Sequence, residues 1–397
     1  MHSRPKQDRP WQRRLKAAWY RLRQLVSNML WWIGNASWLQ RRSDKPLRLD
    51  PADTLIVHMP NHLGDNIMSI PLVRSLVGGG YNNVVLVCLK KYEALWRQQP
   101  GLASVLTING WLSQTAEERS RVKQQIIDVK ARCAILLAPG FDLALMYART
   151  GIAYRIGYDY WGRGMLLTHR LRSYGPPTHH TLVSRHYAQN TLEILSLLGM
   201  PTAPVGIEAP LRAWTQGSRS IAHEPDQAPP AVAICVSGNS PDKTIPNALL
   251  QKIINQGFPD EWQIILLGLE CHREQAAALG EAIGRPVLNK CGETDLEELV
   301  DLLQSSRLLI SPDTGLSHLG AALSVPTIVL FGSGSPVWTR PLGSRVRCVR
   351  TKARCSPCFN ALPCRNGYVC RDSFPETEVL MAIGEFTHPV PELSPHP

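Results

Sequence analysis

The sequence has no apolar run that approaches the ~20 residues needed to cross a bilayer as a helix. It also has no low-complexity tract and no internal repeat at the period of a solenoid. These absences argue against a helical membrane-spanning protein and against a repeat protein. What remains is a chain of 397 residues, of which 44% are hydrophobic. Such a chain is too long for one ordinary core, so we expect two domains.

A disulfide framework is also lacking, although the chain has ten cysteines. Five of them lie between Cys348 and Cys370. Cys88, Cys133 and Cys235 lie in apolar, strand-like runs, where a thiol is usually an inert part of the core. This distribution does not resemble the framework of a small secreted domain, so we favour a reducing compartment.

Excess charge is almost absent outside the first fifty residues. The net charge is +11, but residues 1–50 hold twelve Lys or Arg against three Asp, which gives this segment +9 of the total. The basic character therefore belongs to an N-terminal arm and not to the folded body.

Apolar residues of this arm recur every three or four positions from Trp11 to Ile33, and basic residues fill the other faces. A basic helix with tryptophans on its apolar face is typical of binding to an anionic membrane surface. A helix packed on the body, a disordered arm and a signal peptide are the alternatives. The signal peptide is the least favoured, because Ser27 and Asn28 interrupt a short apolar segment. Nucleic-acid binding is disfavoured, because tryptophan has no obvious use on an arm that tracks phosphates.

Strand and helix patterns alternate in both halves of the chain. In the first half, strand patterns over 54–59, 84–89, 105–108 and 133–138 alternate with helical patterns near 114–131, 141–149 and 184–198. In the second half, strands are expected over 231–236, 263–267, 308–310 and 327–331, with helices near 246–256, after 270 and over 295–305. The alternation predicts an α/β protein made of two Rossmann-like, doubly wound domains that face a central cleft.

Composition sets the expected boundaries. Residues 206–230 are rich in Pro, Ala and polar residues, so we expect a linker there. The predicted division is an arm over 1–50, an N-terminal domain over 51–205, a C-terminal domain over 231–375 with a cysteine-rich segment over 348–370, and a C-terminal helix and tail over 376–397.

The second half contains a strand, a tight turn and a helix that suit a phosphate. The turn is Asp313-Thr314-Gly315, after an apolar strand and before residues at helical spacing. The carboxyl end of a parallel strand that faces a helix N-terminus is a common ligand site. Asp313 either accepts from a ribose or fixes the turn. His318 lies on the same helix face as Thr314, although a lone helical histidine is usually structural.

Three further charged residues follow strands. Asp65 lies at a strand–helix turn of the N-terminal half, where it is either a helix cap or a general base that faces the cleft. Lys243 and Glu270 follow successive strands of the second half, on the edge that holds the phosphate turn. Lys243 suits a diphosphate and Glu270 suits ribose hydroxyls, whereas each taken singly is more typical of a solvated surface charge.

Four cysteines fall within sixteen residues, at Cys355, Cys358, Cys364 and Cys370. The first pair has the x2 spacing of a tetrahedral thiolate site for zinc or iron, and the second pair does not. A loop with free thiols is an equal alternative. Any metal here would be structural, since four protein thiolates leave no open coordination position.

Together these motifs resemble the ADP-heptose–lipopolysaccharide heptosyltransferases (glycosyltransferase family 9), over roughly residues 53–385. Residues 62–71 (HLGDNIMSIP) are similar to the family's glycine–aspartate motif. Residues 311–319 (SPDTGLSHL), with the later PT and LFG, are similar to its donor motif. Residues 355–359 (CSPCF) look like the tail of the branch that adds the second heptose. A relative that heptosylates autotransporter proteins has a similar cysteine finger, which holds iron.

The resemblance implies a GT-B fold and an inverting, metal-independent transfer of heptose from ADP-heptose to the lipopolysaccharide inner core. It implies that Asp65 is the base, Lys243 the phosphate-binding lysine and Glu270 the ribose-binding acid. It places donor contacts on Asp313, Thr314, Gly315 and His318. No cofactor is then required for catalysis. The expected location is cytoplasmic and peripheral on the inner membrane, with residues 1–40 on the anionic surface.

The sequence departs from the family pattern in three places. Thr244-Ile245-Pro246 follows Lys243, where the family often has an aromatic residue. Residues 237–240 (SGNS) replace the commoner threonine or alanine pattern, and the basic arm is unusual. The first two departures bear on the exact nucleotide or sugar, and the third bears on localisation or a partner. Two alternative functions also stand. One is the same chemistry on a protein or another glycan. The other is a non-catalytic nucleotide-sugar-binding protein, which the retained Asp65 disfavours.

Overall fold

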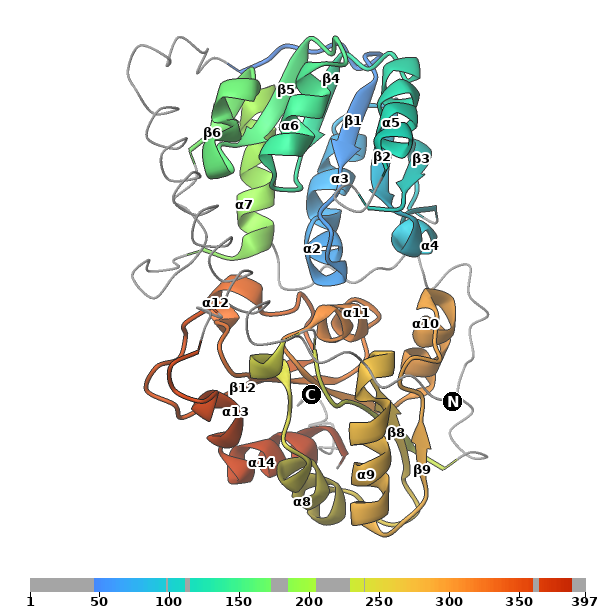
Figure 1. Cartoon of the computed structure of the whole chain (residues 1–397), viewed down its shortest axis with the longest axis vertical. Helices are drawn as coiled ribbons and strands as arrows, with labels where there is room; N and C mark the ends of the chain where they lie inside the picture. The colour runs from blue at the N-terminus through green and yellow to red at the C-terminus, as the bar shows by residue number, and fades with distance from the viewer. Residues whose placement is uncertain are drawn as a thin grey trace, which may run out of the picture.

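The computed structural model describes residues 46–97, 99–110, 115–172, 185–204, 229–238, 240–359 and 364–387. Within these residues the chain forms two α/β domains, the N-terminal one above the C-terminal one in Figure 1. The arm is described only from residue 46, and the predicted linker only from residue 229, so both predictions lie almost wholly outside the described residues. None of the described helices is long and apolar enough to span a membrane.

The N-terminal sheet has the strand order β3-β2-β1-β4-β5-β6, and every pairing in it is parallel. Its strands are β1 (Leu55–His58), β2 (Val84–Leu89), β3 (Leu102–Ile108), β4 (Cys133–Leu136), β5 (Tyr154–Tyr158) and β6 (His169–Leu171). The central strands β1 and β4 are buried along their whole length, as continuous apolar runs in a covered parallel sheet require.

The C-terminal sheet repeats this order as β9-β8-β7-β10-β11-β12, and it is parallel throughout. Its strands are β7 (Ala231–Cys235), β8 (Gln263–Leu267), β9 (Val287–Asn289), β10 (Leu308–Pro312), β11 (Thr327–Phe331) and β12 (Val346–Arg350). In each sheet the strand order reverses beside the first strand, between β1 and β4 and between β7 and β10. Ligands of doubly wound sheets bind at the carboxyl ends of the strands at this switch point.

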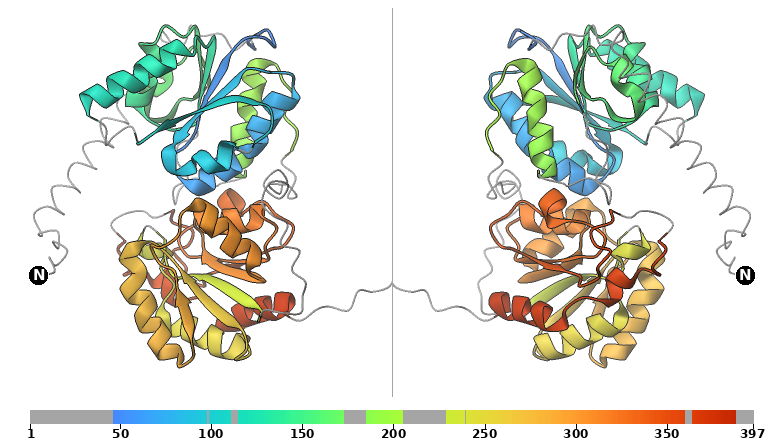
Figure 2. Two further views of the ribbon diagram at one scale, coloured as in Figure 1. Left: turned by 90° about the vertical axis from the view of Figure 1, so that its right-hand side faces the viewer. Right: turned by 90° about the vertical axis from the view of Figure 1, so that its left-hand side faces the viewer.

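Helices cover the sheets (Figures 1 and 2). The N-terminal domain has α2 (Leu63–Met68), α3 (Ile70–Gly78), η2 (Lys90–Tyr92), α4 (Glu93–Arg97), α5 (Ala116–Asp128), α6 (Phe141–Ala148), η3 (Tyr160–Leu166), α7 (Tyr187–Glu193) and η4 (Ile194–Leu198). The C-terminal domain has η6 (Pro241–Lys243), α8 (Asn247–Gly257), η7 (Glu270–His272), α9 (Arg273–Ile283), α10 (Leu296–Ser305), α11 (Gly315–Ala322), α12 (Pro336–Thr339), α13 (Val369–Asp372) and α14 (Glu376–Thr387).

The two domains touch where α2 of the upper domain meets α11 of the lower one (Figure 1). Ile67 of α2 and Leu319 of α11 are both buried in one apolar cluster. A second contact joins α7 to α12, since His186 Nε2 lies 2.7 Å from the carbonyl oxygen of Arg340. The helices that begin at the two switch points are thus held against each other.

The predicted alternation of strands and helices is confirmed, with some boundaries moved. The patterns did not predict β5, β6, β9 and β12. Strands β6 and β9 have only three residues, and β12 is an edge strand whose sequence, VRCVR, puts charge beside valine. Helix α2 begins at Leu63, so Asp65 lies in its first turn.

Candidate active site

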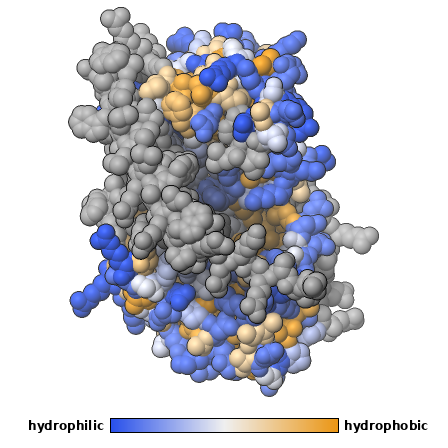
Figure 3. All heavy atoms as spheres, viewed as in Figure 1, coloured by the Kyte–Doolittle hydropathy of each residue, from blue (hydrophilic) through white to orange (hydrophobic). Residues whose placement is uncertain are grey.

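A cleft of about 640 Å³ lies between the two domains, and it contains both predicted motifs. Figure 3 shows the surface hollowed at the level where the domains meet. Of the predicted site residues, the cleft is lined by Asp65, Lys243, Asp313, Thr314, Gly315 and His318. Segments far apart in the sequence therefore meet at the facing switch points of the two sheets.

Asp65 reaches the cleft from the first turn of α2. The N-cap of this helix is His62, so Asp65 is not the cap that one interpretation of the sequence proposed. The neighbouring Asn66 is fully buried and fixes the turn, because its amide nitrogen donates to the carbonyl oxygens of Pro60 and His62, each at 2.8 Å. Trp96 donates to the Asn66 amide oxygen at 3.0 Å. Asn66 and Trp96 thus hold in place the helix start that carries Asp65.

The electrostatic environment of Asp65 suits a proton acceptor. Burial raises the pKa of its carboxyl above the ordinary value, and the charge of Asp313 raises it further. The charges of His62 and Lys243 oppose this by lowering the same pKa. A carboxylate that is partly desolvated holds a proton more tightly than one in water, which is what a general base requires.

Across the cleft, the predicted phosphate turn has the expected form. Thr314 is the N-cap of α11, and Gly315 is its first residue. Lys243 Nζ lies 3.6 Å from Asp313 Oδ2, and the Thr339 hydroxyl donates to the same oxygen at 3.3 Å. The free N–H groups at the start of α11 and the ammonium of Lys243 place positive potential on this side of the cleft.

Glycines let the two helix starts approach. A Cβ at Gly64 would lie 2.7 Å from His318 Cδ2, and a Cβ at Gly315 would lie 2.7 Å from the Cβ of Leu63. Neither distance is possible between real side chains, so each position requires glycine in this arrangement. The resemblance implies a donor contact at Gly315, and the structure shows this residue packed against the other domain as well as lining the cleft.

His318 is buried in α11 beside Asp313, and its Nε2 lies 4.0 Å from Asp313 Oδ1. Burial lowers the pKa of His318 to about 3, and the charges of His186 and Lys243 act in the same direction. The ring is therefore neutral near pH 7 and makes no ion pair with Asp313. Its Nδ1 is buried with no hydrogen-bond partner among the described residues.

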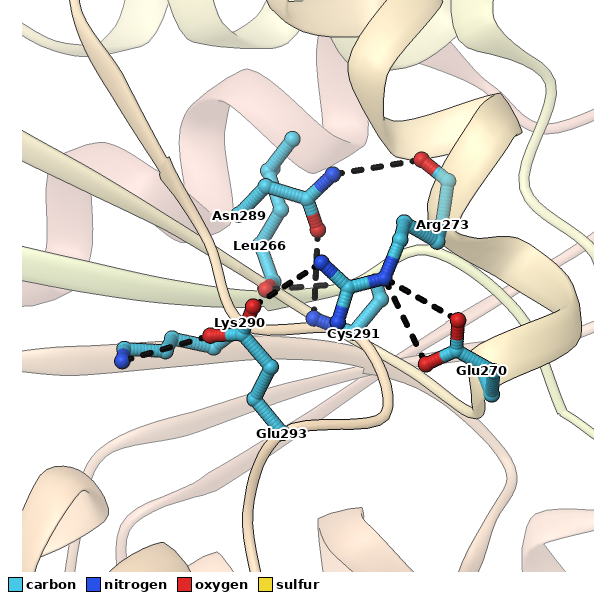
Figure 4. A network of polar contacts seen from close by, with 7 residues as sticks. All are labelled: Leu266, Glu270, Arg273, Asn289, Lys290, Cys291 and Glu293. Atoms are coloured by element: carbon cyan, nitrogen blue, oxygen red, sulfur yellow. Dashed lines mark hydrogen bonds and ion pairs between the residues drawn. The ribbon is translucent and has the colours of Figure 1, made fainter.

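Glu270 is the predicted site residue that the structure does not bring into the cleft. The neighbouring Gly268 and Leu269 line the cavity, but the Glu270 side chain is 72% exposed and pairs with Arg273 at 3.2 Å. Figure 4 shows this pair in a network that continues to Glu293. Its ribose-binding role stays a prediction.

Three polar or aromatic residues of the N-terminal side were not among the predicted site residues. His62, Lys91 and Tyr92 also line the cleft. Lys91 Nζ lies 4.9 Å from the centre of the Tyr92 ring. Burial raises the pKa of Tyr92 to about 12, and the charge of Asp65 adds to the effect. The sequence contains a pattern that could have predicted two of them, since Lys91 and Tyr92 follow the strand over 84–89 at the same sheet edge as Asp65.

Two arginines of the N-terminal domain donate to backbone carbonyls. Arg163 is fully buried and donates to the carbonyl oxygens of Tyr158, Ala138 and Leu136 at 2.7, 2.5 and 3.0 Å. It therefore stabilises the chain around β4 and β5. Arg155 also donates to backbone carbonyls, and Arg172 is exposed.

The cysteine-rich segment packs against the C-terminal sheet, where the Cys358 N–H donates to the Ser333 carbonyl at 3.0 Å. Burial raises the pKa of Cys370 to about 11, and the charges of Cys358, Asp242, Cys355 and Cys364 raise it further. No three acidic, histidine or cysteine side chains of the described residues are arranged to hold a metal ion. A metal on this segment stays a prediction.

The architecture and the paired switch points define a two-domain, Rossmann-like protein of the GT-B type. The family model for "Glycosyltransferase family 9 (heptosyltransferase)" matches residues 119–368. The chain therefore belongs to glycosyltransferase family 9, as the resemblance of its motifs implied.

Individual relatives agree with this assignment. The chain is 24% identical over 312 residues to lipopolysaccharide heptosyltransferase 2 of Escherichia coli K12, which covers 75% of this chain and 87% of that protein. It is 35% identical over 106 residues to the Salmonella typhimurium protein of the same name, covering 26% of this chain and 29% of that protein. The structure of E. coli ADP-heptose LPS heptosyltransferase II superposes with a TM-score of 0.60 at 20% identity, over 84% of this chain and 99% of that one.

Proposed function

We propose that this protein is an inverting glycosyltransferase that moves heptose from ADP-heptose to a hydroxyl of the lipopolysaccharide inner core. The observation that carries the proposal is the position of Asp65 opposite Lys243 and the N-terminus of α11, in one cleft of a family 9 chain. The relatives are named as lipopolysaccharide heptosyltransferases, which supports the acceptor class. The solved E. coli relative is named for ADP-heptose, which supports the donor.

The proposed reaction is a single displacement. Asp65 takes the proton of the acceptor hydroxyl while that oxygen forms a bond to the anomeric carbon, on the face opposite the leaving diphosphate. The bond between the anomeric carbon and the diphosphate oxygen breaks, and ADP leaves with the electron pair. One bond forms as one breaks on the opposite face, so the anomeric configuration inverts.

The donor side stabilises the charge that develops on ADP. Lys243 is the nearby ammonium, and Asp313 holds it at 3.6 Å in the direction of the cleft. The first N–H groups of α11 add fixed dipoles. Because protein groups supply this positive charge, we propose that transfer needs no metal ion, and we expect activity to survive an excess of EDTA.

The cysteine segment is proposed to be structural. The segment is bonded to the chain just after β11, through the Cys358 N–H to the Ser333 carbonyl and the Ser356 hydroxyl to the Gly332 carbonyl. No three acidic, histidine or cysteine side chains of the described residues are arranged to share an ion. Metal analysis of the purified protein tests whether zinc or iron is bound there. The membrane-binding role of residues 1–40 also remains a proposal, as does a peripheral position on the inner membrane.

A transfer assay tests the proposed function. Purified protein is incubated with ADP-heptose and with truncated lipopolysaccharide acceptors, and products are detected by mass. A gain of one heptose in the acceptor and equimolar ADP is the expected result. Transfer only to a protein or to an unrelated glycan would replace the acceptor, and binding of ADP-heptose without turnover would support a non-catalytic protein.

A further inference from the structure

A buried carboxylate precedes Lys243, the cation on the donor side of the cleft. Asp242 lies in η6 immediately before Lys243, and it is only 4% exposed. Lys243 lines the cleft, whereas Asp242 is not among the described residues that do so. Burial of a carboxylate is costly unless the group is hydrogen-bonded, so the partner of Asp242 indicates what this side chain does.

The partner is Ser333, in the turn that follows β11. Its hydroxyl donates to Asp242 Oδ2. The other carboxylate oxygen, Oδ1, is buried and has no hydrogen-bond partner among the described residues. Within this part of the chain, the carboxylate therefore depends on Ser333. Without that hydroxyl the buried charge would be unsatisfied, and η6 would have to shift to bring it to water.

The same turn touches both sides of Lys243. On one side, a Cβ at Gly332 would lie 2.9 Å from the carbonyl oxygen of Asp242. On the other side, a Cβ at Gly334 would lie 2.6 Å from Asp313 Oδ2, the oxygen that is 3.6 Å from Lys243 Nζ. Burial raises the pKa of Asp313, and the charge of Asp242 raises it further, which agrees with their proximity. The turn thus packs against the backbone beside Lys243 and against the carboxylate beside its ammonium.

The cysteine-rich segment is bonded to this turn. The N–H groups of Cys358 and Phe359 donate to the Ser333 carbonyl at 3.0 and 2.8 Å. The Ser356 hydroxyl donates to the Gly332 carbonyl at 2.7 Å. Three hydrogen bonds therefore join the segment to the two residues that contact Asp242. A displacement of the segment would be passed to η6 through them.

We infer that Asp242 is a positioning residue for the donor lysine, and that the cysteine-rich segment acts on the donor site through Ser333 and Asp242. The segment holds the turn, the turn holds the buried carboxylate, and the carboxylate fixes the backbone from which Lys243 reaches the cleft. The inference rests on the proposed function for the role of Lys243. It adds a part for the cysteine-rich segment in the binding of the diphosphate.

Binding of two nucleotides to Ser333→Ala tests the inference. ADP has the diphosphate that Lys243 is proposed to meet, whereas adenosine lacks it. Calorimetry should show a Kd for ADP that is raised about three- to tenfold, and a Kd for adenosine within about twofold of the parent value. An unchanged Kd for ADP, or an equal rise for adenosine, would overturn the inference.

Ser306→Ala is the matched control for that variant. Ser306 is also a buried serine of the C-terminal domain, and its hydroxyl donates to the Leu302 carbonyl at 2.8 Å, away from the cleft lining. Both Kd values should stay at those of the parent. A rise for ADP in Ser306→Ala equal to that in Ser333→Ala would show that loss of any buried hydroxyl weakens ADP binding, and would overturn the inference.

A double-mutant cycle shows whether the effect passes through Lys243. In the Lys243→Met background, Ser333→Ala should weaken ADP binding by less than about twofold, because the ammonium that the turn positions is already gone. Full additivity would mean that the turn acts on ADP by another route, and would overturn the role of Asp242 while leaving the proposed function intact. Unchanged ADP affinity in Lys243→Met alone would overturn the donor assignment, and the inference with it.

The part given to the cysteine-rich segment is tested at its outer bond. Ser356→Ala removes the hydroxyl that bonds the Gly332 carbonyl, and we expect the Kd for ADP to rise about threefold while that for adenosine stays unchanged. The variant leaves Ser333 in place, so it also serves should Ser333→Ala fail to fold. The control is Ser373→Ala, which removes a hydroxyl bonded to the Val369 carbonyl. Parent-like ADP affinity in Ser356→Ala, or an equal change in Ser373→Ala, would overturn the role of the segment.

Discussion

Helices α2 and α11 begin at equivalent points of the two domains, and each has an aspartate at its start. Asp313 precedes the N-cap of α11 and has close partners, Lys243 at 3.6 Å and the Thr339 hydroxyl at 3.3 Å. Asp65, in the first turn of α2, is influenced by burial first and by Lys243 only through its charge. The pKa of both carboxyls is raised by burial, but hydrogen bonds lower only that of Asp313.

The difference shows how one local geometry can serve two roles. A carboxylate that contacts a lysine and a hydroxyl fixes the positions of both groups. Asp313 is therefore suited to orient Lys243 toward a diphosphate. A carboxylate without such partners keeps its lone pairs for a proton. The neighbours of each aspartate, and not the strand–turn–helix unit itself, distinguish the two sides of the cleft.

The strongest test of the comparison is Asp65→Asn, which keeps the shape of the side chain and removes the base. We expect kcat to fall by about 10²–10⁴-fold, because that is the usual contribution of a general base. The Kd for ADP should change by less than about twofold, since the proposed nucleotide site lies on the opposite domain. Steady-state kinetics and calorimetry measure the two quantities.

Asp142→Asn is the matched control for that variant. Asp142 is an exposed carboxylate in the first turn of α6, in the same domain but outside the cleft, and its loss should leave kcat unchanged. If Asp65→Asn retained full turnover, Asp65 would not be the base.

The second largest loss of activity should come from a substitution on the donor side of the cleft. Lys243→Met removes the ammonium beside the proposed diphosphate site, and we expect kcat/KM to fall by about 10²–10³-fold. ADP should also bind more weakly, which separates this variant from Asp65→Asn. Lys290→Met is the control, because Lys290 pairs with Glu293 outside the cleft lining. Unchanged ADP affinity in Lys243→Met would remove Lys243 from the donor site.

The third largest loss of activity should come from a substitution that disturbs the contact between the starts of α2 and α11. Gly64→Ala places a methyl group 2.7 Å from His318 Cδ2, so α2 and α11 must separate. We expect kcat/KM to fall about tenfold, because the base and the donor turn then lose their alignment. The double variant Gly64→Ala/His318→Ala should recover part of the loss. Gly78→Ala is the control, since nothing lies within 4 Å of a Cβ there. Equal losses in the single and double variants would show that the clash is not the cause.

The sequence predicts this site well where a strand pattern ends in a polar turn. Asp65, Lys243 and Asp313 all follow buried strands, and parallel strands bring such turns to one edge. Glu270 follows a strand too, but it lies at the start of a helical segment, where its side chain pairs with Arg273 three residues on instead of entering the cleft. Local pattern locates the turn and leaves the direction of a side chain open.

Contacts between the domains could not be predicted in this way. The fit of Gly64 against His318, and the link from Tyr187 to Trp338, join residues more than 150 positions apart. Arg163 is a further case, since nothing in the sequence pattern indicates that its guanidinium donates to buried backbone carbonyls. The orientation of such groups is decided by packing in three dimensions.

The smallest expected effect concerns stability. Burial raises the folded-state pKa of Asp65 above the ordinary value of 3.8, so ionisation of this carboxyl costs folding free energy. Below that ordinary value the carboxyl is protonated in both states and Asp65→Asn should match the parent. As the pH rises through the raised pKa, the parent loses stability that the asparagine variant keeps, so the variant should have the higher unfolding temperature at pH 7.

Thermal unfolding of Asp65→Asn, Asp142→Asn and the parent, measured from pH 3 to pH 8, tests this order. The difference between Asp65→Asn and the parent should grow from near zero at acid pH to a plateau, and Asp142→Asn should follow the parent throughout. An Asp65→Asn variant that is less stable than the parent at pH 7 would mean that attraction to Lys243 outweighs desolvation. Asp65 would then resemble Asp313, and the contrast between the two helix starts would be lost.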